Sequence, residues 1–380
     1  MSESTVPNQD PQRHDASIVP DESKRYMASQ WRLMWLKFKD HKVAVFSLYL
    51  VLLLYLMAVF CEFLAPADPT QRNVKGRYAP PQRVHLIHDG GPRWPFVYQL
   101  VQHKDPETLR VSYTEDRSEP RSLRFFTRGD PYRLWGLIPM QRHLIGVEPG
   151  SRVYFLGADQ LGRDVLSRII YGSRISLSIG LVGVIMSLVL GIIIGGISGY
   201  YGGWIDSLIQ RGIEVLQSFP TIPLWLALSA AMPAEWSQLM IYFCMTVILA
   251  LLGWTSVARV VRGKILSLRE EDYAMAAQVA GAREMSIILR HLVPGFLSHL
   301  IVVVTIAIPQ MILAETSLSF LRLGLRPPTI SWGVLLQDAQ DINAVALYPW
   351  LLSPAVIVIV AVLMFNFLGD GLRDAADPYH

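Results

Sequence analysis

Long apolar stretches without a single charged residue alternate with polar segments along this chain. Six stretches of 19 residues or more contain no Asp, Glu, Lys or Arg: Val43 to Cys61, Ile175 to Ile205, Val215 to Ala234, Trp236 to Ala258, His291 to Ala314 and Ile342 to Gly369. About 20 consecutive apolar residues cross the hydrocarbon core of a bilayer as a helix. Strands of an outer-membrane barrel would alternate apolar and polar residues instead. The pattern therefore predicts an all-α membrane protein with six transmembrane helices.

The six predicted spans fall into two parts of the chain. The first is expected at about 43–64, and the others at 175–199, 220–234, 237–258, 292–317 and 349–369. Residues 29–64 form one unit, because the segment before the first span repeats Trp31, Trp35 and Phe38 at helical spacing among basic residues. Such a segment is typical of a helix that lies at the membrane interface. Residues 174–380 form a core of five helices.

Two further segments are predicted to lie outside the membrane. Residues 1–28 are polar and contain three prolines, which predicts a disordered tail without the apolar region of a cleavable signal peptide. Residues 65–173 contain no run long enough to cross and are rich in proline, arginine and aromatic residues. They are expected to form a folded loop domain and the helix that leads into the second span.

Composition and charge narrow the class of protein and its orientation. Apolar residues make up 52% of the chain and charged residues 17%, against roughly 25% charged in soluble domains, which excludes a soluble enzyme. The net charge of +3 is too small to indicate a nucleic-acid partner. Basic residues are dense before the first span and at 259–290, and short basic loops face the cytoplasm, whereas a loop as long as 65–173 crosses regardless of charge. Both termini and 259–290 are therefore predicted to be cytoplasmic, and 65–173 extracytoplasmic.

The polar segment 259–290 carries the clearest candidate for a function. Ser267 and Glu270 have the spacing of a capping box, which predicts that a helix starts there. Tyr273 and the small residues after it share one face, and Gly281 is expected to end the helix as a C-cap. A short helix outside the membrane with a small-residue face suits docking of a soluble partner. The alternative is an ordinary loop between two spans.

The same segment resembles the coupling loop of bacterial ABC importer permeases. That loop reads Glu-Ala-Ala, three residues, Gly, nine residues, Ile, any residue, Leu-Pro, and the corresponding positions here are Met275, Ala276, Ala277, Gly281, His291, Val293 and Pro294. Met275, His291 and Val293 depart from the pattern. The form Tyr-x-x-Ala-Ala beginning at Tyr273, with Arg290 and His291 before Leu-Val-Pro, is similar to the oligopeptide/dipeptide branch, which does not need Glu at the first position.

Three more stretches, 156–168, 199–206 and 371–378, are similar to the second, longer-looped permease subunit of that branch. The resemblance covers 29–65 and 156–380. The region 66–155 is longer than in most such subunits and looks like the enlarged extracytoplasmic loop of members that include sugar importers.

The resemblance implies a subunit of a larger assembly in the bacterial inner membrane. The expected partners are a second permease subunit in a heterodimer, two ATPase subunits or domains that bind ATP and Mg, and an extracytoplasmic substrate-binding protein. The residues implied in ATPase coupling are Ser267, Glu270, Asp272, Tyr273, Ala276, Ala277, Gly281, Arg290, His291 and Pro294. The chain lacks a phosphate-loop motif and any metal-ligand spacing, so we expect neither a cofactor nor an enzymatic activity of its own.

Other residues have one functional and one structural interpretation each. Glu315 and His299 are candidates for the translocation path, but Glu315 is equally suited to bonding near the end of its span, and His299 to the core. Four aromatic residues of the loop domain are candidates either for its core or for contact with the binding protein: Trp94, Phe96, Tyr132 and Trp135. A third set, spaced by four, suits close helix packing or a kink: Gly191, Gly195 and Gly199.

The expected function is that of a permease subunit of an ATP-driven importer for peptides or solutes of similar size, including oligosaccharides. A self-sufficient ion-coupled transporter is the rival, and it would require an intramembrane relay of charged groups and an inverted repeat. An envelope scaffold that only anchors the loop domain is a third possibility, for which six spans are more than needed.

Overall fold

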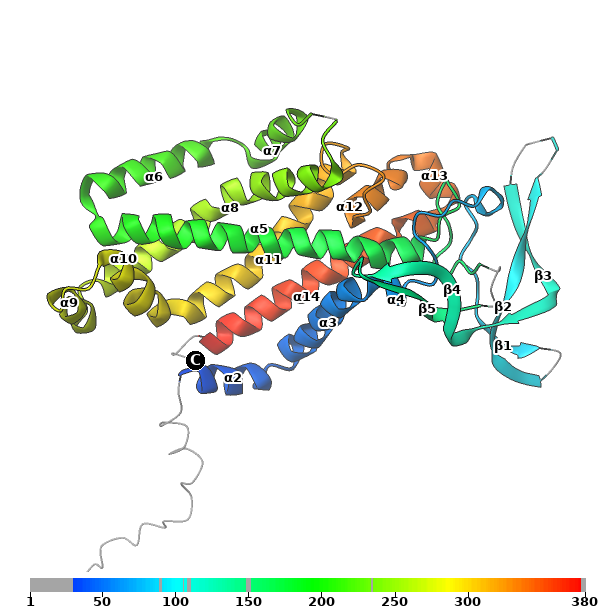
Figure 1. Cartoon of the computed structure of the whole chain (residues 1–380), viewed down its shortest axis with the longest axis horizontal. Coiled ribbons are helices and arrows are strands. Elements are labelled where there is room, and N and C mark those ends of the chain that lie inside the picture. The colour runs from blue at the N-terminus through cyan, green and yellow to red at the C-terminus, as the bar shows by residue number, and fades with distance from the viewer. Residues whose placement is uncertain are drawn as a thin grey trace, which may run out of the picture.

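The computed structural model describes residues 30–88, 91–104, 106–107, 111–147, 152–233 and 235–376, which form a helical bundle with a β-rich domain at one end (Figure 1). The predicted disordered tail, 1–28, lies outside the described residues.

Five transmembrane helices agree with the predicted spans, and each is long and apolar enough to cross a bilayer. They are α3 (Lys42–Val59), α5 (Val165–Tyr201), α8 (Gln238–Leu268), α11 (Leu297–Phe320) and α14 (Ser353–Ala376). Both α5 and α8 extend beyond the predicted limits, because their polar ends continue the helix outside the apolar stretch. The predicted all-α architecture therefore holds for the membrane part of the chain.

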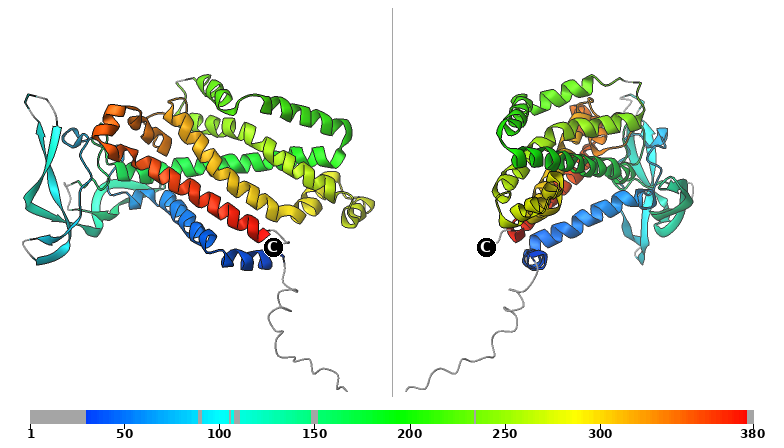
Figure 2. Two further views of the ribbon diagram at one scale, coloured as in Figure 1. Left: turned by 180° about the vertical axis from the view of Figure 1, so that it is seen from behind. Right: turned by 60° about the vertical axis from the view of Figure 1, so that its left-hand side comes forward.

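The third predicted span, 220–234, has the wrong limits. The structure instead contains α6 (Gly203–Ser218) followed by α7 (Thr221–Ala230), with a break at Phe219 and Pro220. Together the two helices run along α8 from one end of the bundle to the other (Figures 1 and 2). Arg211 and Glu214 lie within α6 and pair with each other at 3.1 Å. Because of these charges, α6 does not appear as an apolar stretch in the sequence, and Pro220 separates it from α7.

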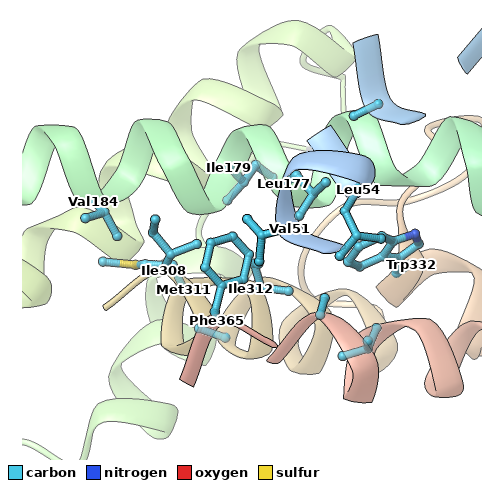
Figure 3. Close-up of a cluster of buried hydrophobic side chains, with 14 of the residues drawn as sticks. Val51, Leu54, Leu177, Ile179, Val184, Ile308, Met311, Ile312, Trp332 and Phe365 are labelled. Carbon is cyan, nitrogen blue, oxygen red and sulfur yellow. The ribbon is translucent and has the colours of Figure 1, made fainter. Parts of the chain in front are cut away.

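The central core lies where α3, α5, α11 and α14 meet. Figure 3 shows its side chains converging from these helices, with Trp332 from the short helix α12 (Trp332–Leu335) at one end. The residues shown and labelled there are buried and apolar: Val51, Leu54, Leu177, Ile179, Val184, Ile308, Met311, Ile312, Trp332 and Phe365.

A glycine seam brings α5 and α8 into close contact. A Cβ on Gly191 would lie 2.6 Å from Val257, and one on Gly199 would lie 2.8 Å from the Arg262 carbonyl oxygen. Gly195 faces Ala258 even more closely. Only residues without a side chain allow two helix backbones to approach in this way.

The amphipathic segment before the first span forms α2 (Gln30–Asp40). Phe38 is buried against the last turns of α14, and Trp35 stacks on it with ring centroids 5.7 Å apart. Lys39 lies 5.4 Å above the Trp35 ring. A helix with aromatic and basic residues at the end of a span is the arrangement expected at a membrane surface.

The loop domain is built from β-strands, which the sequence analysis did not predict. One antiparallel sheet contains β1 (His85–His88), β2 (Gly91–Lys104) and β3 (Val111–Ser122), and a second contains β4 (Arg124–Leu134) and β5 (Ile138–Gly146). Short helical turns complete the end of the molecule that carries the sheets: α4 (Cys61–Leu64), η1 (Val74–Gly76), η4 (Leu336–Gln340), α13 (Ile342–Leu347) and η5 (Pro349–Leu352).

Buried ionic contacts attach the loop domain to the bundle. Asp159 accepts hydrogen bonds from Arg163, at 2.7 Å, and from Arg168, which also lies 3.8 Å from Asp338. Asp164 caps α5 by accepting from the backbone N–H of Ser167 at 2.7 Å. Complete burial raises the pKa of Asp164 to about 6. The start of α5 is therefore held rigidly to the loop before it.

Candidate functional site

The segment between α8 and α11 projects from the end of the bundle opposite the sheets (Figures 1 and 2). It contains α9 (Asp272–Val279) and α10 (Glu284–Ser286), followed by the turns η2 (Ile287–Leu292) and η3 (Val293–Phe296) that lead into α11. Pro294 occupies the first turn of η3, where its missing N–H leaves no helical hydrogen bond unmade.

The predicted capping box at Ser267 and Glu270 is not formed. Ser267 lies inside α8, which continues to Leu268, and α9 begins only at Asp272 without a side-chain cap. Leu268 packs on the buried apolar cluster beneath α9, so α8 gains more from another turn than from ending at the cap.

Gly281 ends α9 in a Schellman turn, as its position predicted. Its φ is +80°, its N–H donates to Gln278 O at 3.0 Å, and the N–H of Ala282 donates to Ala277 O at 3.1 Å. The left-handed conformation is one that glycine adopts without strain. The turn sends the chain back toward the bundle.

The predicted face of α9 is exposed at Tyr273, Ala276 and Ala280, but not at Ala277. Ala274 is buried and Ala277 half-buried against the cluster formed by η2, so both point inward. Met275 and Val279 point outward instead, and Val279 is 90% exposed. Neither residue was among the predicted coupling residues, although a helical wheel anchored on Ala274 places both on the exposed side.

The surface of α9 is apolar at Met275 and Val279, and most of the predicted coupling residues lie around these two. All of the predicted coupling residues except Ala277 are exposed: Ser267, Glu270, Asp272, Tyr273, Ala276, Gly281, Arg290, His291 and Pro294. Partial burial and the neighbouring carboxylate of Glu271 raise the pKa of Tyr273. Exposed apolar side chains on a projecting helix indicate a contact surface for another protein.

Three polar links join this projection to the helix ends behind it. Arg269 donates to the carbonyl oxygens of Gly199 and Tyr200, both at 3.3 Å, and so covers the end of α5. Tyr201 donates to the carboxylate of Glu284 at the base of α10. The segments on either side of α9 are therefore bonded to the end of α5.

At the same end of the bundle, an ion pair connects α8 to α6. The guanidinium of Arg262 donates to both carboxylate oxygens of Asp206, each at 2.5 Å, and Ser198 of α5 shares that carboxylate. Paired geometry of this kind fixes the orientation of both side chains.

A cavity of ≈ 1160 Å³ lies between α6–α7 and the rest of the bundle. Its middle is lined by polar groups of neighbouring helices, among them the side chain of Gln217, which donates to Thr255 at 3.0 Å. The indole N–H of Trp225 is buried at its wall and has no hydrogen-bond partner among the described residues. Its volume slightly exceeds the range of about 300–1,000 Å³ typical of pockets that hold drug-sized ligands.

The two residues proposed for the translocation path are placed differently. His299 lines the cavity at the start of α11. Glu315 is fully buried outside the cavity and accepts hydrogen bonds from Ser176 at 3.0 Å and from Ser319 and Ser331 at 2.8 Å each. Its geometry matches the structural interpretation, in which the carboxylate is bonded near the end of its span.

The aromatic residues of the loop domain divide in the same way. Phe96 is completely buried and packs edge-on against Tyr98, so it belongs to the interior of the domain. Trp94 and Trp135 remain 60% and 49% exposed, although each donates its indole N–H to a backbone carbonyl. Tyr132 is half-buried and donates to Arg142 O at 2.6 Å. Trp94 and Trp135 thus stay available for contact with another protein.

Comparisons with known proteins match both parts of the membrane region. The model of a family described as "Binding-protein-dependent transport system inner membrane component" matches residues 187–379, and that of the "N-terminal TM domain of oligopeptide transport permease C" matches residues 29–81. The oligopeptide transport system permease protein OppC of Bacillus subtilis is 35% identical, covering 61% of this chain and 73% of that protein. The dipeptide transport system permease protein DppC of Lactococcus lactis is 31% identical, covering 90% of this chain and 89% of that protein.

Proposed function

Because the chain belongs to the family of inner-membrane components of binding-protein-dependent transport systems, we propose that it forms one half of the pore of an importer for short peptides. It is a permease subunit of an ATP-driven ABC importer, as its resemblance to that family predicted. Proteins named for oligopeptide and for dipeptide transport are among its relatives. The match to the dipeptide permease covers about nine tenths of each chain, so the two chains are of similar length. A chain with an enlarged loop can therefore belong to a protein named for dipeptide transport. The sugar and ion-coupled alternatives are not favoured.

The observation that carries the peptide proposal is the character of the cavity. A peptide backbone presents N–H donors and C=O acceptors at every residue. The cavity offers amide and hydroxyl groups for both, together with apolar surface for side chains and the indole N–H of Trp225, which no described residue accepts. The amide and hydroxyl side chains that line it are those of Ser187, Gln217, Thr221, Thr255, Ser256, Ser298 and Gln310.

The partners follow from the surfaces that the chain leaves uncovered. The ATPase partner would dock on α9, and the substrate-binding protein on the loop domain at the opposite end. A second permease subunit would cover α6 and α7, where apolar side chains are largely exposed, with Trp204 at 75%, Leu208 at 64% and Val215 at 60%. We propose that ATP and Mg are bound by the ATPases alone and that this chain hydrolyses nothing.

The geometry suggests how ATP binding would open and close the pore. The ATPases would move α9, and the links from Arg269 to α5 and from Tyr201 to Glu284 would pass this movement to α5. The glycine seam would make α5 and α8 move as a unit, and the α6–α7 pair would then approach or leave the cavity. The cavity would face one side of the membrane at a time.

Reconstituted transport tests the function. We expect the complete complex in proteoliposomes, supplied with ATP and its binding protein, to accumulate a radiolabelled tripeptide but not a trisaccharide. The chemical basis is the amide-lined cavity, and the control is the same vesicle loaded with a non-hydrolysable ATP analogue. Accumulation of the sugar alone would contradict the peptide assignment.

The proposed orientation places both termini in the cytoplasm. A reporter fused after Pro120, within β3, is expected to read as extracytoplasmic, because α3 is the one span that precedes it among the described residues. The matched fusion after Asp272, at the start of α9, should read as cytoplasmic. The reverse pair of signals would overturn the topology.

A further inference from the structure

Three basic side chains gather at one end of the cavity. Lys264 lies near the end of α8, His299 in the first turn of α11 and Arg373 near the end of α14, and all three line the same cavity. These three helix ends lie at the end of the bundle that carries α9 (Figure 1). We call Lys264, His299 and Arg373 the basic cluster.

The charge of this cluster is not balanced within the cavity. No Asp or Glu is among the described residues that line it. Within the described part of the chain, neither Lys264 nor Arg373 has a carboxylate within ion-pair distance. Two other arginines at this end are engaged, since Arg262 pairs with Asp206 and Arg269 bonds to backbone carbonyls. Among the described residues, the two permanent positive charges thus have no carboxylate partner, and both side chains are exposed.

A carboxylate is the group that this arrangement suits best. Ammonium and guanidinium groups form their strongest hydrogen bonds with carboxylates, and both donate without accepting. A linear peptide carries one carboxylate, at its C-terminus, and one ammonium group, at its N-terminus. The basic cluster attracts the first and repels the second. Low-dielectric walls around a cavity strengthen both effects.

We propose that the basic cluster binds the C-terminal carboxylate of the transported peptide at the cytoplasmic end of the cavity. The permease itself would then favour peptides with a free C-terminus and would orient them with that end toward the cytoplasm. This inference rests on the proposed peptide transport and adds a selectivity that resides in this chain as well as in the binding protein. Gln310 and Trp225 lie farther along the cavity and would contact the rest of the peptide.

The test compares one tripeptide as its free acid and as its C-terminal amide. Uptake of both is measured in proteoliposomes that contain the complete complex and one preparation of binding protein, whose own affinities for acid and amide are measured in parallel. We expect the double variant K264Q/R373Q to lower the acid-to-amide ratio of uptake rates by about tenfold, the loss expected for one charge-assisted hydrogen bond. K264R, which keeps the charge, should retain the ratio of the unmodified protein.

Arg326 provides the matched control, because it is exposed, lies in the loop after α11 and does not line the cavity. R326Q should leave the ratio unchanged. If K264Q/R373Q slows acid and amide equally, the two charges serve the ATPase contact or the fold, and the inference is overturned. If the unmodified complex takes up neither peptide, the proposed function itself has failed, and the inference falls with it.

Discussion

Replacing Val279 with glutamate is expected to abolish ATP-driven uptake without reducing the amount of folded permease in the membrane. Val279 is 90% exposed at the end of α9, so the substitution removes almost no contact within the chain. If this surface docks into an apolar groove of the ATPase, the new charge is buried without a partner. An unpaired buried charge costs about 3–5 kcal/mol, which corresponds to roughly two to four orders of magnitude in docking affinity.

The measurement is peptide uptake together with the ATPase activity that co-purifies with the permease in mild detergent. Val74→Glu is the matched control for the co-purified ATPase activity, because Val74 is 75% exposed in the loop domain, away from α9. Normal uptake by the Val279 variant would remove α9 as the coupling surface. Gly281 is a poorer target, since any side chain at its φ of +80° strains the turn. A loss of uptake in such a variant could then come from misfolding as well as from lost docking.

Replacing Glu315 with alanine is expected to destabilise the permease by about 3–5 kcal/mol. The carboxylate accepts from Ser176, Ser319 and Ser331, and each of these hydroxyls would lose its acceptor in a buried site. The serines in turn accept from the backbone N–H groups of Trp332, Leu325 and Val334, respectively. The substitution would therefore also weaken the hydrogen bonds that hold the segment after the C-terminal end of α11.

Thermal denaturation of the purified protein in detergent measures this effect. Glu315→Gln serves as the control, since an amide oxygen can still accept from Ser319 and Ser331 and only the contact with Ser176 changes its character. We expect a much smaller fall in midpoint for glutamine than for alanine. Equal midpoints for the alanine variant and the unmodified protein would show that this network contributes nothing to stability.

Features that depend on local sequence were predictable. Crossing a bilayer requires a run of apolar residues, so five spans were visible as charge-free stretches, and the turn at Gly281 followed from the freedom of glycine to adopt positive φ. Helix α6 was missed because Arg211 and Glu214 neutralise each other only once the helix has formed. The capping box at Ser267 failed because Leu268 gains tertiary contacts that the local pattern does not contain.

Features assembled from distant segments were not predictable from one sequence. The cavity draws its lining from α5, α6, α7, α8, α11 and α14, and nothing in any one of them marks it. The sheets of the loop domain escaped notice because their strands mix charged and apolar residues, with both faces partly exposed. For Glu315, burial chose between two interpretations that the sequence had left open.

The length of α5 has a mechanical consequence. With 37 residues, the helix is about 55 Å long, far more than the roughly 30 Å of the hydrocarbon core. Its N-terminal end is fixed by Asp164 and Arg168, and its C-terminal end is held by Arg269. A rod of this length that pivots at one end by a single degree shifts the other by about 1 Å. Binding of ATP to the ATPases at one face of the membrane would thus displace the loop domain at the other face. The helix between them would rotate as a rigid rod and would not deform.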